Sequence, residues 1–271
     1  MIVYQAADFL SQMQQADLTV CGPAGARAVL MVEPAEFTVN TECAADNHYM
    51  DLKEEADSSL ASKQARGLAQ LIASKGIEVV WFPGRKETPD AIFPNNVFAT
   101  TPERFIVGHM YHPSRKQEAD RDDIRGYFHE RGYQTIDLSV RKCIAELTGT
   151  LIIDSARKIG FCGMSKRVNQ AGLKAMHDAF GLKMTFSFQL DADEYHTNVV
   201  MMILASRACV IYPPAFVDPA VPEAIARAFP GRTLVLDKAE KDAFAGNCIA
   251  LTDKDLFMSQ TGFDALRPAS R

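Results

Sequence analysis

The stretch GTLIIDSARKIGFCGMSKRVNQAGLKAMHDAFGLKMTFSFQ, residues 149–189, contains every element of the unit from which this chain is built. Two apolar runs, 149–154 and 158–164, predict neighbouring β-strands. Residues 166–180 have helical spacing of apolar side chains, and 183–189 form a third apolar run. The stretch therefore predicts the order strand, strand, helix, strand.

The same order of elements recurs before and after this stretch. Upstream, the two predicted strands, the helix and the last strand cover 91–101, 104–110, 114–131 and 133–139. Downstream, they cover 197–205, 208–213, 222–229 and 233–237. The units share their order but no residue motif. A period of roughly 45 to 55 residues is typical of propellers and repeat arrays.

The two ends of the chain supply the remaining elements. Predicted strands at 247–252 and 255–259 begin another unit, which strand 28–37, helix 54–74 and strand 76–83 complete or neighbour. No Gly- or Ser-rich linker divides the chain, so residues 1–271 are predicted to form a single α/β domain. Circular closure of the units would remove exposed sheet edges and bring their loops to one central cavity.

The composition is that of a globular protein, with 47% hydrophobic residues and a net charge of −5. Lys and Arg form no cluster, which argues against a nucleic-acid partner. No apolar run reaches the roughly 18 to 20 residues that span a bilayer, and the first residues do not have the pattern of a signal peptide. The six cysteines form no C-x-x-C pair, which argues against a zinc knuckle. We therefore expect free thiols, no membrane partner and a location in the reducing cytoplasm.

Cys248 lies in AFAGNCIALTDKDLFMSQ, residues 243–260, in an apolar run behind Gly246 and Asn247. A free cysteine in such a run is typical of a small buried hydrophobe. The alternative is a nucleophile on a strand, beside a gap that the glycine leaves open. A nucleophilic cysteine needs a base. His196 stands at the front edge of an apolar strand, where an imidazole faces either a cavity or a structural hydrogen bond. The residues alone leave both alternatives open.

Two further segments carry titratable side chains next to apolar runs. Glu146 comes just before a turn of small residues and a buried strand, either as a cavity acid or as a surface turn acid. His109 and His112 have a spacing typical of metal ligands, but no acidic or thiol partner is close to them in the sequence. We expect no metal at these histidines.

Polar residues also occur at the predicted strand 91–101 and at the start of the predicted helix 166–180. Asp90, Asn95 and Asn96 either satisfy backbone groups at a bulge or meet a polar ligand, since a buried unbonded polar group costs about 1 to 3 kcal/mol. Ser165 is predicted to be the N-cap of the helix at 166–180. Arg167 would then lie in the first turn, where the helix dipole disfavours a cation unless it binds a carboxylate.

Together these segments resemble the guanidino-group-modifying superfamily, which includes dimethylarginine dimethylaminohydrolase, arginine deiminase and the amidinotransferases. GMSKRVNQAG is very similar to the Ser-Lys-Arg-Thr-Asn stretch of the family, and TPDAIFPNNVFATT resembles its Pro-Asp-x-x-Phe-x-x-Asp strand. HPSRKQEADR resembles its Pro-Ser-Arg segment, AELTGTLIID the segment of the catalytic acid, YHTNVVMM that of the catalytic histidine, and AGNCIAL the cysteine strand. MVEPAEFTVN, FPNN and GN resemble most the arginine-deiminase-related branch, which includes the citrulline-utilisation hydrolases.

The resemblance implies a five-bladed α/β propeller and assigns three catalytic residues. Cys248 is the nucleophile and His196 the general acid and base. Glu146 holds the guanidinium or polarises the histidine. Through these residues the chain is expected to hydrolyse the guanidino C–N bond of arginine or an arginine derivative, with a covalent intermediate on Cys248. The products would be a ureido, citrulline-like compound and ammonia or an amine, and no cofactor is implied.

The resemblance also assigns the residues that bind the small-molecule guanidino substrate. Asp90 and Asn96 lie at the guanidino or amine end, and Arg115 and Arg167 contact the carboxylate, to which arginine bonds in a bidentate manner. Asn96 stands where the family has a second aspartate, which puts free arginine in doubt as the substrate. An amidinotransferase, a non-catalytic guanidine-binding protein and a homodimer all remain open.

Overall fold

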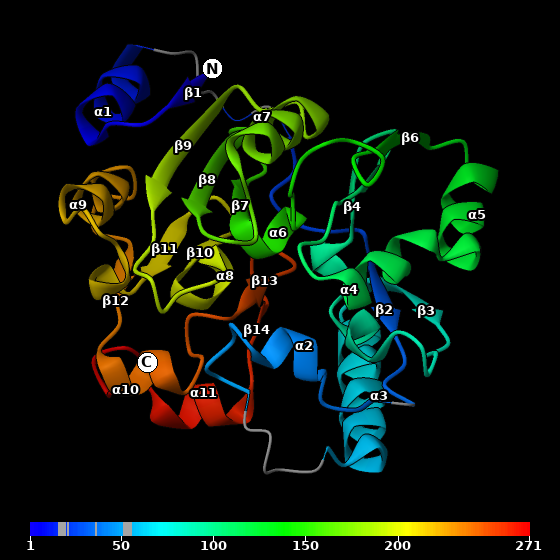
Figure 1. Cartoon of the computed structure of the whole chain (residues 1–271). Helices are drawn as coiled ribbons and strands as arrows, with labels where there is room; N and C mark the ends of the chain where they lie inside the picture. Colours follow the sequence, from blue (N-terminus) through cyan, green and yellow to red (C-terminus); the bar gives the residue numbers. More distant parts are fainter. Residues whose placement is uncertain (16–19, 21, 36, 51–55) are drawn as a thin grey trace. The chain divides into compact units, whose positions relative to one another are not determined.

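The computed structural model describes residues 1–15, 20, 22–35, 37–50 and 56–271. The chain forms two compact units that interleave along the sequence. The first unit comprises Met1–Gly25, Thr148–Asn169 and Met176–Arg271, and the second comprises Ala26–Leu147 and Gln170–Ala175. Each unit combines β-sheet with helices (Figure 1), which confirms the predicted α/β class.

The largest sheet of the first unit has the strand order β1-β9-β8-β7 (Figure 1). Its strands are β1 (Ile2–Val3), β7 (Leu151–Asp154), β8 (Ile159–Met164) and β9 (Met184–Gln189). Strands β7 and β8 are antiparallel, β8 and β9 are parallel, and α7 (Gln170–Ala179) lies between β8 and β9 in the chain. All six residues of β8 are buried, as its unbroken apolar sequence predicts for a central strand.

A second sheet of the first unit repeats this arrangement with fewer strands. It is formed by β10 (Met201–Leu204), β11 (Ala208–Ile211) and β12 (Thr233–Val235), with α9 (Ala220–Arg227) before the last strand. A short hairpin of β13 (Ile249–Ala250) and β14 (Leu256–Phe257) follows. The remaining helices of this unit are α1 (Ala6–Gln15), α8 (Thr197–Val200), η4 (Pro213–Ala215), α10 (Lys238–Asp242) and α11 (Gln260–Ala265).

Two sheets lie within the described residues of the second unit. In one, β2 (Ala28–Val32) pairs in parallel with β3 (Glu78–Phe82), and α3 (Ser58–Ser74) lies between them in the chain. The other consists of β4 (Phe98–Thr101), β5 (Arg104–Val107) and β6 (Gln134–Asp137), with α5 (Asp122–Glu130) before β6. The short helices of the second unit are α2 (Thr41–Ala44), η1 (Pro89–Ile92), η2 (Pro94–Asn96), α4 (Pro113–Lys116) and η3 (Gln117–Asp120). Helix α6 (Leu147–Thr150) begins at Leu147, where the chain passes from the second unit back to the first.

Three of these sheets share one pattern of connections, which confirms the unit predicted from the sequence. In β4-β5-β6, β7-β8-β9 and β10-β11-β12 the first two strands are antiparallel and the last two parallel, with a helix between the parallel strands. A parallel pair needs such a crossover, because the chain must return to the same end of the sheet.

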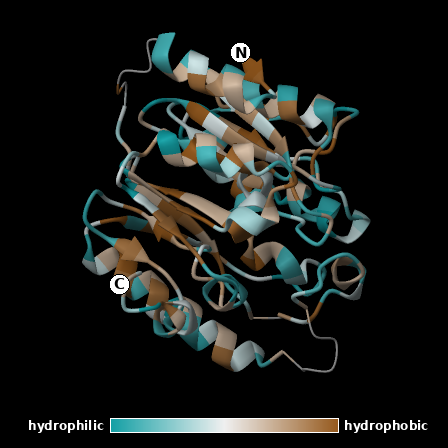
Figure 2. Ribbon diagram, turned by 90° about the vertical axis from the view of Figure 1, so that its left-hand side faces the viewer, coloured by the Kyte–Doolittle hydropathy of each residue, from teal (hydrophilic) through white to brown (hydrophobic). Residues whose placement is uncertain are grey.

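Aromatic side chains fill the core of each unit. In the second unit the ring of Phe105 stacks on Phe98 at 5.5 Å and on Phe128 at 4.5 Å. In the first unit Phe9 of α1 stacks on Phe186 of β9 at 4.6 Å. Figure 2 shows the corresponding pattern, with mainly hydrophobic strands and helices that alternate between hydrophobic and hydrophilic residues.

Prolines and acidic residues shorten several predicted elements. The strand predicted over 91–101 is wrong in its first half, because Pro89 and Pro94 each begin a 3-10 helix and only β4 is extended. The helix predicted over 114–131 is broken at Arg121, whose backbone is extended, and Asp122 and Asp123 then begin α5.

Other predicted boundaries also shift. The helix predicted over 166–180 begins only at Gln170, so Ser165 is not its N-cap and Arg167 lies outside it. The segments 147–150 and 197–200 are helical turns in front of β7 and β10. Parts of two predicted elements, residue 36 of strand 28–37 and residues 54 and 55 of helix 54–74, lie outside the described residues.

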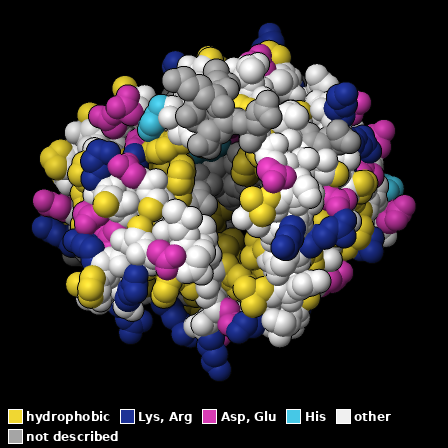
Figure 3. Space-filling view, turned by 90° about the horizontal axis from the view of Figure 1, so that it is seen from below, with side chains coloured by type: hydrophobic (Ala, Val, Ile, Leu, Met, Phe, Trp, Pro, Cys, Tyr) yellow, Lys and Arg dark blue, Asp and Glu magenta, His cyan; other side chains and the backbone are white. Residues whose placement is uncertain are grey.

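Charged side chains of both signs are distributed over the surface. On the face in Figure 3, Lys and Arg side chains are interspersed with Asp and Glu side chains among the described residues. Within the same residues, no helix combines the length and hydropathy that crossing a membrane requires.

Candidate active site

Cys248 lies in the first unit, one residue before β13, after a helix whose two ends are both capped. Asp237 and Glu240 form a capping box at the start of α10. At its end the amide of Phe244 donates to the Lys241 carbonyl and the amide of Ala245 to the Glu240 carbonyl, which is a Schellman motif. Phe244 takes the left-handed conformation, φ 58°, where glycine is usual. The main chain in front of Cys248 is therefore fixed by local hydrogen bonds.

The Cys248 side chain is buried, with 4% of its surface exposed. It belongs to an apolar cluster with Val210, Leu236 and Leu266. Burial raises the pKa of the Cys248 thiol to about 11. The glycine at 246 leaves no gap beside it, since a Cβ there would lie 3.1 Å from Leu236 Cδ1.

His196 is also in the first unit, at the N-cap position of α8, and is buried. The residues on both sides of it are held by hydroxyl groups. Ser165 Oγ donates to the Tyr195 carbonyl at 2.7 Å. Thr197 Oγ1 accepts from the Gly163 amide at 2.9 Å and donates to the Thr150 carbonyl at 2.7 Å. The backbone that carries His196 is thus bonded to the segments of β7 and β8.

Arg167 lies near the same loop of the first unit. Its amide donates to Ser165 Oγ at 3.1 Å, and its guanidinium is 5.3 Å from the centre of the Tyr195 ring. The Tyr195 ring in turn packs against that of His196, with centroids 4.4 Å apart. The structure therefore brings Arg167 and His196 to the same tyrosine, and the buried guanidinium makes a cation–π contact with its ring.

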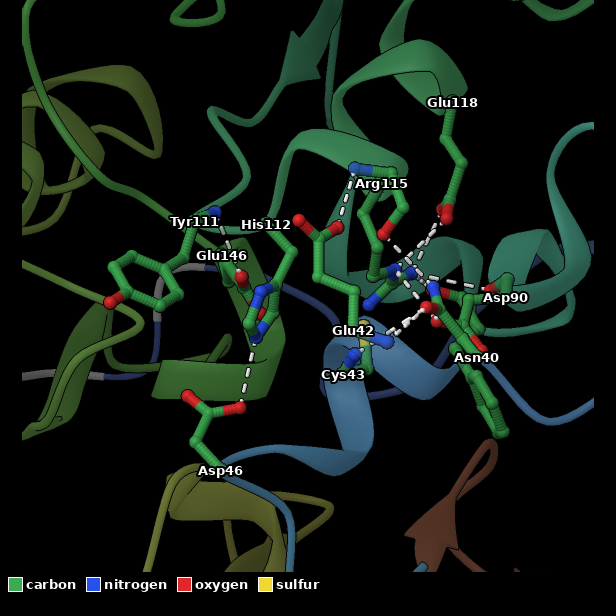
Figure 4. Close-up of polar contacts among 12 residues, drawn as sticks. Asn40, Glu42, Cys43, Asp46, Asp90, Tyr111, His112, Arg115, Glu118 and Glu146 are labelled. Carbon is green, nitrogen blue, oxygen red and sulfur yellow. Dashed lines mark hydrogen bonds and ion pairs between the residues drawn. The ribbon is translucent and has the colours of Figure 1, made fainter. Parts of the chain in front are cut away.

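Glu146 is in the second unit and is completely buried. Its Oε1 accepts a hydrogen bond from the Tyr111 amide at 3.0 Å (Figure 4). The preceding residue, Ala145, pairs with His109 in an antiparallel bridge. Gly172 of α7 approaches the same segment so closely that a Cβ would lie 1.7 Å from the Ile144 carbonyl oxygen. Close backbone packing therefore sets the place of this carboxylate.

We expect Gly172→Ala to lower the melting temperature markedly, because the new methyl group would overlap the Ile144 carbonyl and the chain must move. Overpacking typically costs about 1 to 3 kcal/mol, and occasionally more. Gly67→Ala is the matched control: Gly67 lies within α3, where a Cβ would meet nothing within 4 Å, and it should stabilise the protein by up to about 1 kcal/mol. Equal unfolding midpoints in urea for the two variants would contradict the expected overlap.

Asp90 lies in η1 of the second unit, and its carboxylate is oriented by an asparagine far away in the sequence. Asn40 Nδ2 donates to Asp90 Oδ2 at 2.8 Å and to Ser114 Oγ at 3.0 Å (Figure 4). The other amide atom, Asn40 Oδ1, caps α2 by accepting from the amides of Glu42 and Cys43. Every polar atom of the Asn40 side chain is thus used to fix Asp90 and α2.

Arg115 is a second buried neighbour of Asp90 (Figure 4). Its Nε and Nη2 donate to the Glu118 carboxylate at 2.9 and 2.8 Å, and Nε is 3.9 Å from Asp90 Oδ2. Nη2 also donates to the carbonyls of Asp90 and Phe93. Burial alone lowers the pKa of Arg115, but the negative charges of Glu118, Glu146 and Asp90 outweigh it and raise that pKa. Nη1 makes no hydrogen bond within the described part of the chain.

The remaining candidates of the second unit make hydrogen bonds to other residues of that unit. Asn96 is buried at the end of η2, and its Oδ1 accepts from Asn95 Nδ2 at 3.0 Å. His109 bonds the Arg141 carbonyl, and His112 Nε2 is 2.9 Å from Asp46 Oδ1 (Figure 4). Over the described ranges, no group of three or more His, Cys, Asp or Glu residues could hold a metal ion.

Sequence reasoning missed Asn40 and Glu118, which hold Asp90 and Arg115. Asn40 was detectable as a cap, because an asparagine directly before a helix is a common N-cap. Glu118 follows Arg115 by three residues, a spacing that brings side chains together on a helix.

The seven predicted residues divide between the units: Cys248, His196 and Arg167 lie in the first, and Asp90, Asn96, Arg115 and Glu146 in the second.

Comparison with known proteins gives a family match over most of the chain. Residues 33–271 match the family described as "N,N dimethylarginine dimethylhydrolase, eukaryotic". The uncharacterized protein YkgA of Bacillus subtilis (strain 168) is 22% identical over 205 residues, which are 74% of this chain and 67% of that protein.

Two solved structures show that the fold is shared. The substrate-bound N-terminal domain of ArgZ, an arginine dihydrolase from the ornithine-ammonia cycle in cyanobacteria, has a TM-score of 0.73 at 20% identity, covering 87% of this chain and 85% of that chain. A histidine-to-glycine variant of dimethylarginine dimethylaminohydrolase, in adduct with S-methyl-L-thiocitrulline, has a TM-score of 0.66 at 14% identity over the same two shares.

Proposed function

This chain belongs to the N,N-dimethylarginine dimethylhydrolase family, which confirms the predicted superfamily and its class of guanidino C–N hydrolases, and we propose that it hydrolyses arginine or an arginine derivative through Cys248. One observation carries the proposal: the family match covers all seven residues assigned from the sequence. All seven are buried, although five of them carry charged or titratable polar groups that ordinarily lie at the surface.

The environment of the second unit favours a cationic ligand. Asp90 and Glu146 are buried carboxylates, and Arg115, the cation between them in sequence, already has a carboxylate partner in Glu118. Buried carboxylates are stabilised by a positive charge that also donates hydrogen bonds, and a guanidinium does both. Asn40 holds one oxygen of Asp90, which leaves the carboxylate oriented before a substrate binds.

The proposed reaction has two halves. The thiolate of Cys248 adds to the guanidino carbon, and a C–N bond breaks as His196 protonates the departing ammonia or amine. Water, deprotonated by the same histidine, then attacks the thiouronium carbon. The C–S bond breaks, the ureido product leaves and the thiol is regenerated. Glu146 is proposed to hold the guanidinium or to polarise the histidine.

The two arginines are proposed to fix the other end of the substrate. Arg115 uses one edge of its guanidinium for Glu118, and we assign Nη1, which faces no such partner, to the substrate carboxylate. Arg167, packed on Tyr195, is assigned to the same carboxylate. Asn96 is assigned to the amine or guanidino end of the substrate. Its amide is uncharged and does not balance the positive charge there.

The finer features of the fold also remain proposals. We propose that the sheets close into a five-bladed α/β propeller of one domain, which the common connection of three sheets supports. The cytoplasmic location and a homodimer stay predictions from the sequence.

A panel of guanidino compounds tests the proposal. Arginine, the methylated arginines and shorter guanidino acids are incubated with the protein, and the ureido product is measured by colour reaction and ammonia or amine by coupled assay. Stoichiometric release of both from at least one compound is expected. Product formation that requires an added amine would identify an amidinotransferase. Binding of a guanidine without turnover, unchanged in Cys248→Ala, would identify a non-catalytic binder.

A further inference from the structure

A buried ion pair lies near the predicted catalytic residues of the first unit. Lys241 Nζ is 2.6 Å from Glu194 Oε1, and the two side chains are only 8% and 4% exposed. Lys241 Nζ is also 5.6 Å from the centre of the Tyr212 ring. Burial of two charges carries a desolvation penalty, and apolar residues of similar volume often stabilise a fold equally well. Stability alone therefore explains this pair poorly.

The pair joins the two segments that carry the proposed nucleophile and the proposed acid and base. Glu194 stands two residues before His196 in the loop that leads to α8. Lys241 lies in the last turn of α10, the capped helix that ends six residues before Cys248. A side-chain contact thus connects a loop and a helix that are separated by more than forty residues of sequence.

The same two segments meet again close to the reactive residues themselves. Asn247 Nδ2 donates to the Asn198 carbonyl at 3.2 Å. Beside it, Gly246 approaches the Val199 carbonyl, which would lie 3.2 Å from a Cβ at that position. The histidine segment is therefore tied to the cysteine segment on both sides of His196, by an ion pair before it and by the side-chain hydrogen bond of Asn247 after it.

We propose that Lys241 and Glu194 are positioning residues that hold the His196 loop in register with the Cys248 loop. The inference rests on the proposed function, because register matters where the thiolate must reach the guanidino carbon while the proton reaches the nitrogen that leaves it. Such groups need placement within about 0.5 Å, and a displacement of about 1 Å can reduce the rate by about 10²-fold.

Lys241→Met and Glu194→Gln test the proposal, because each removes one charge and keeps most of the side-chain volume. We expect kcat to fall about 10- to 100-fold with KM changed less than about threefold, since the substrate contacts remain. The value of kcat should be lower across the pH range, because proton transfer by His196 becomes slower. Alkylation of Cys248 by 2-chloroacetamidine, followed by mass spectrometry, should slow by a similar factor.

Lys238→Met provides a matched control on the same helix. Lys238 forms an exposed pair with Asp242 at 2.5 Å, and its side chain is 76% exposed, so no change in kcat or alkylation is expected. Kinetics are compared at a temperature at which circular dichroism shows every variant to be folded.

The double variant Lys241→Met/Glu194→Leu separates register from stability. It leaves no unpaired buried charge, so its melting temperature should recover, whereas kcat should stay low. Recovery of kcat together with the melting temperature would overturn the proposal, as would single variants that keep kcat and alkylation within about twofold of the parent. If the parent protein turns over no guanidine, the proposed function fails, and the alkylation rates alone decide whether the pair positions Cys248.

Discussion

Replacement of Cys248 with alanine is expected to reduce guanidine turnover by at least about 10⁴-fold, because the variant lacks the sulfur atom that forms the covalent bond. The fold should persist, since alanine is nearly as small as cysteine and the site is lined by Val210, Leu236 and Leu266. Steady-state assays measure the loss. Mass spectrometry of the intact parent protein, quenched during turnover, should show an adduct that the variant cannot form.

Cys209→Ala is the matched control for this experiment. Cys209 lies in β11 of the same unit and is fully buried, so its replacement removes an equally buried sulfur without touching the proposed site. Its activity should stay within about twofold of the parent. If Cys248→Ala kept a turnover comparable to that of Cys209→Ala, the Cys248 thiol would take no part in the reaction.

The alkylation of Cys248 by neutral iodoacetamide is expected to accelerate about tenfold per pH unit from pH 7 to pH 9, which is about 100-fold in total. The reason is the buried position of the thiol, which raises its pKa to about 11, so that the reactive thiolate grows in proportion to hydroxide over this range. Rates are measured by quenching at intervals and by peptide mass spectrometry. A plateau near neutral pH would contradict the raised pKa.

A cationic reagent should behave differently at the same thiol. 2-Chloroacetamidine brings a positive charge next to Cys248, and an adjacent cation lowers a thiol pKa. Its reaction should therefore be fast at pH 7, depend less on pH, and label Cys248 well ahead of the other five cysteines. Cys162 and Cys209 are internal controls, because burial raises the pKa of each to about 12. Equal labelling of several thiols would argue against an activated nucleophile.

The recurring unit was predictable from the sequence because buried strands are read directly from apolar runs. The six residues of β8 are an example: they are all buried, and no polar residue interrupts them. Element boundaries were less predictable where backbone chemistry outweighs hydropathy. Pro89 and Pro94 begin 3-10 helices where a strand was predicted, and Thr197–Val200, predicted as the start of a strand, form a helical turn.

The candidate site was predictable only in part. Cys248, His196 and Glu146 were indicated by their segments and assigned by resemblance, and their roles stay predictions. The groups that orient the site were not visible, because they depend on contacts between distant residues. Asn40 and Asp90 are fifty residues apart, and Lys241 and Glu194 nearly as far. In neither pair does the local sequence around one residue indicate which distant residue it contacts.

The strand β1 has a consequence for synthesis on the ribosome. Ile2 and Val3 pair with Thr185 and Phe186 of β9, so the first strand of the chain has its only β-sheet partner, within the described residues, far downstream. At a synthesis rate of about 5 to 20 residues per second, β1 emerges about 10 to 40 seconds before β9. Over that interval residues 2 and 3 of the nascent chain lack their β-sheet partner, and the first unit completes only after both segments of the second have been translated.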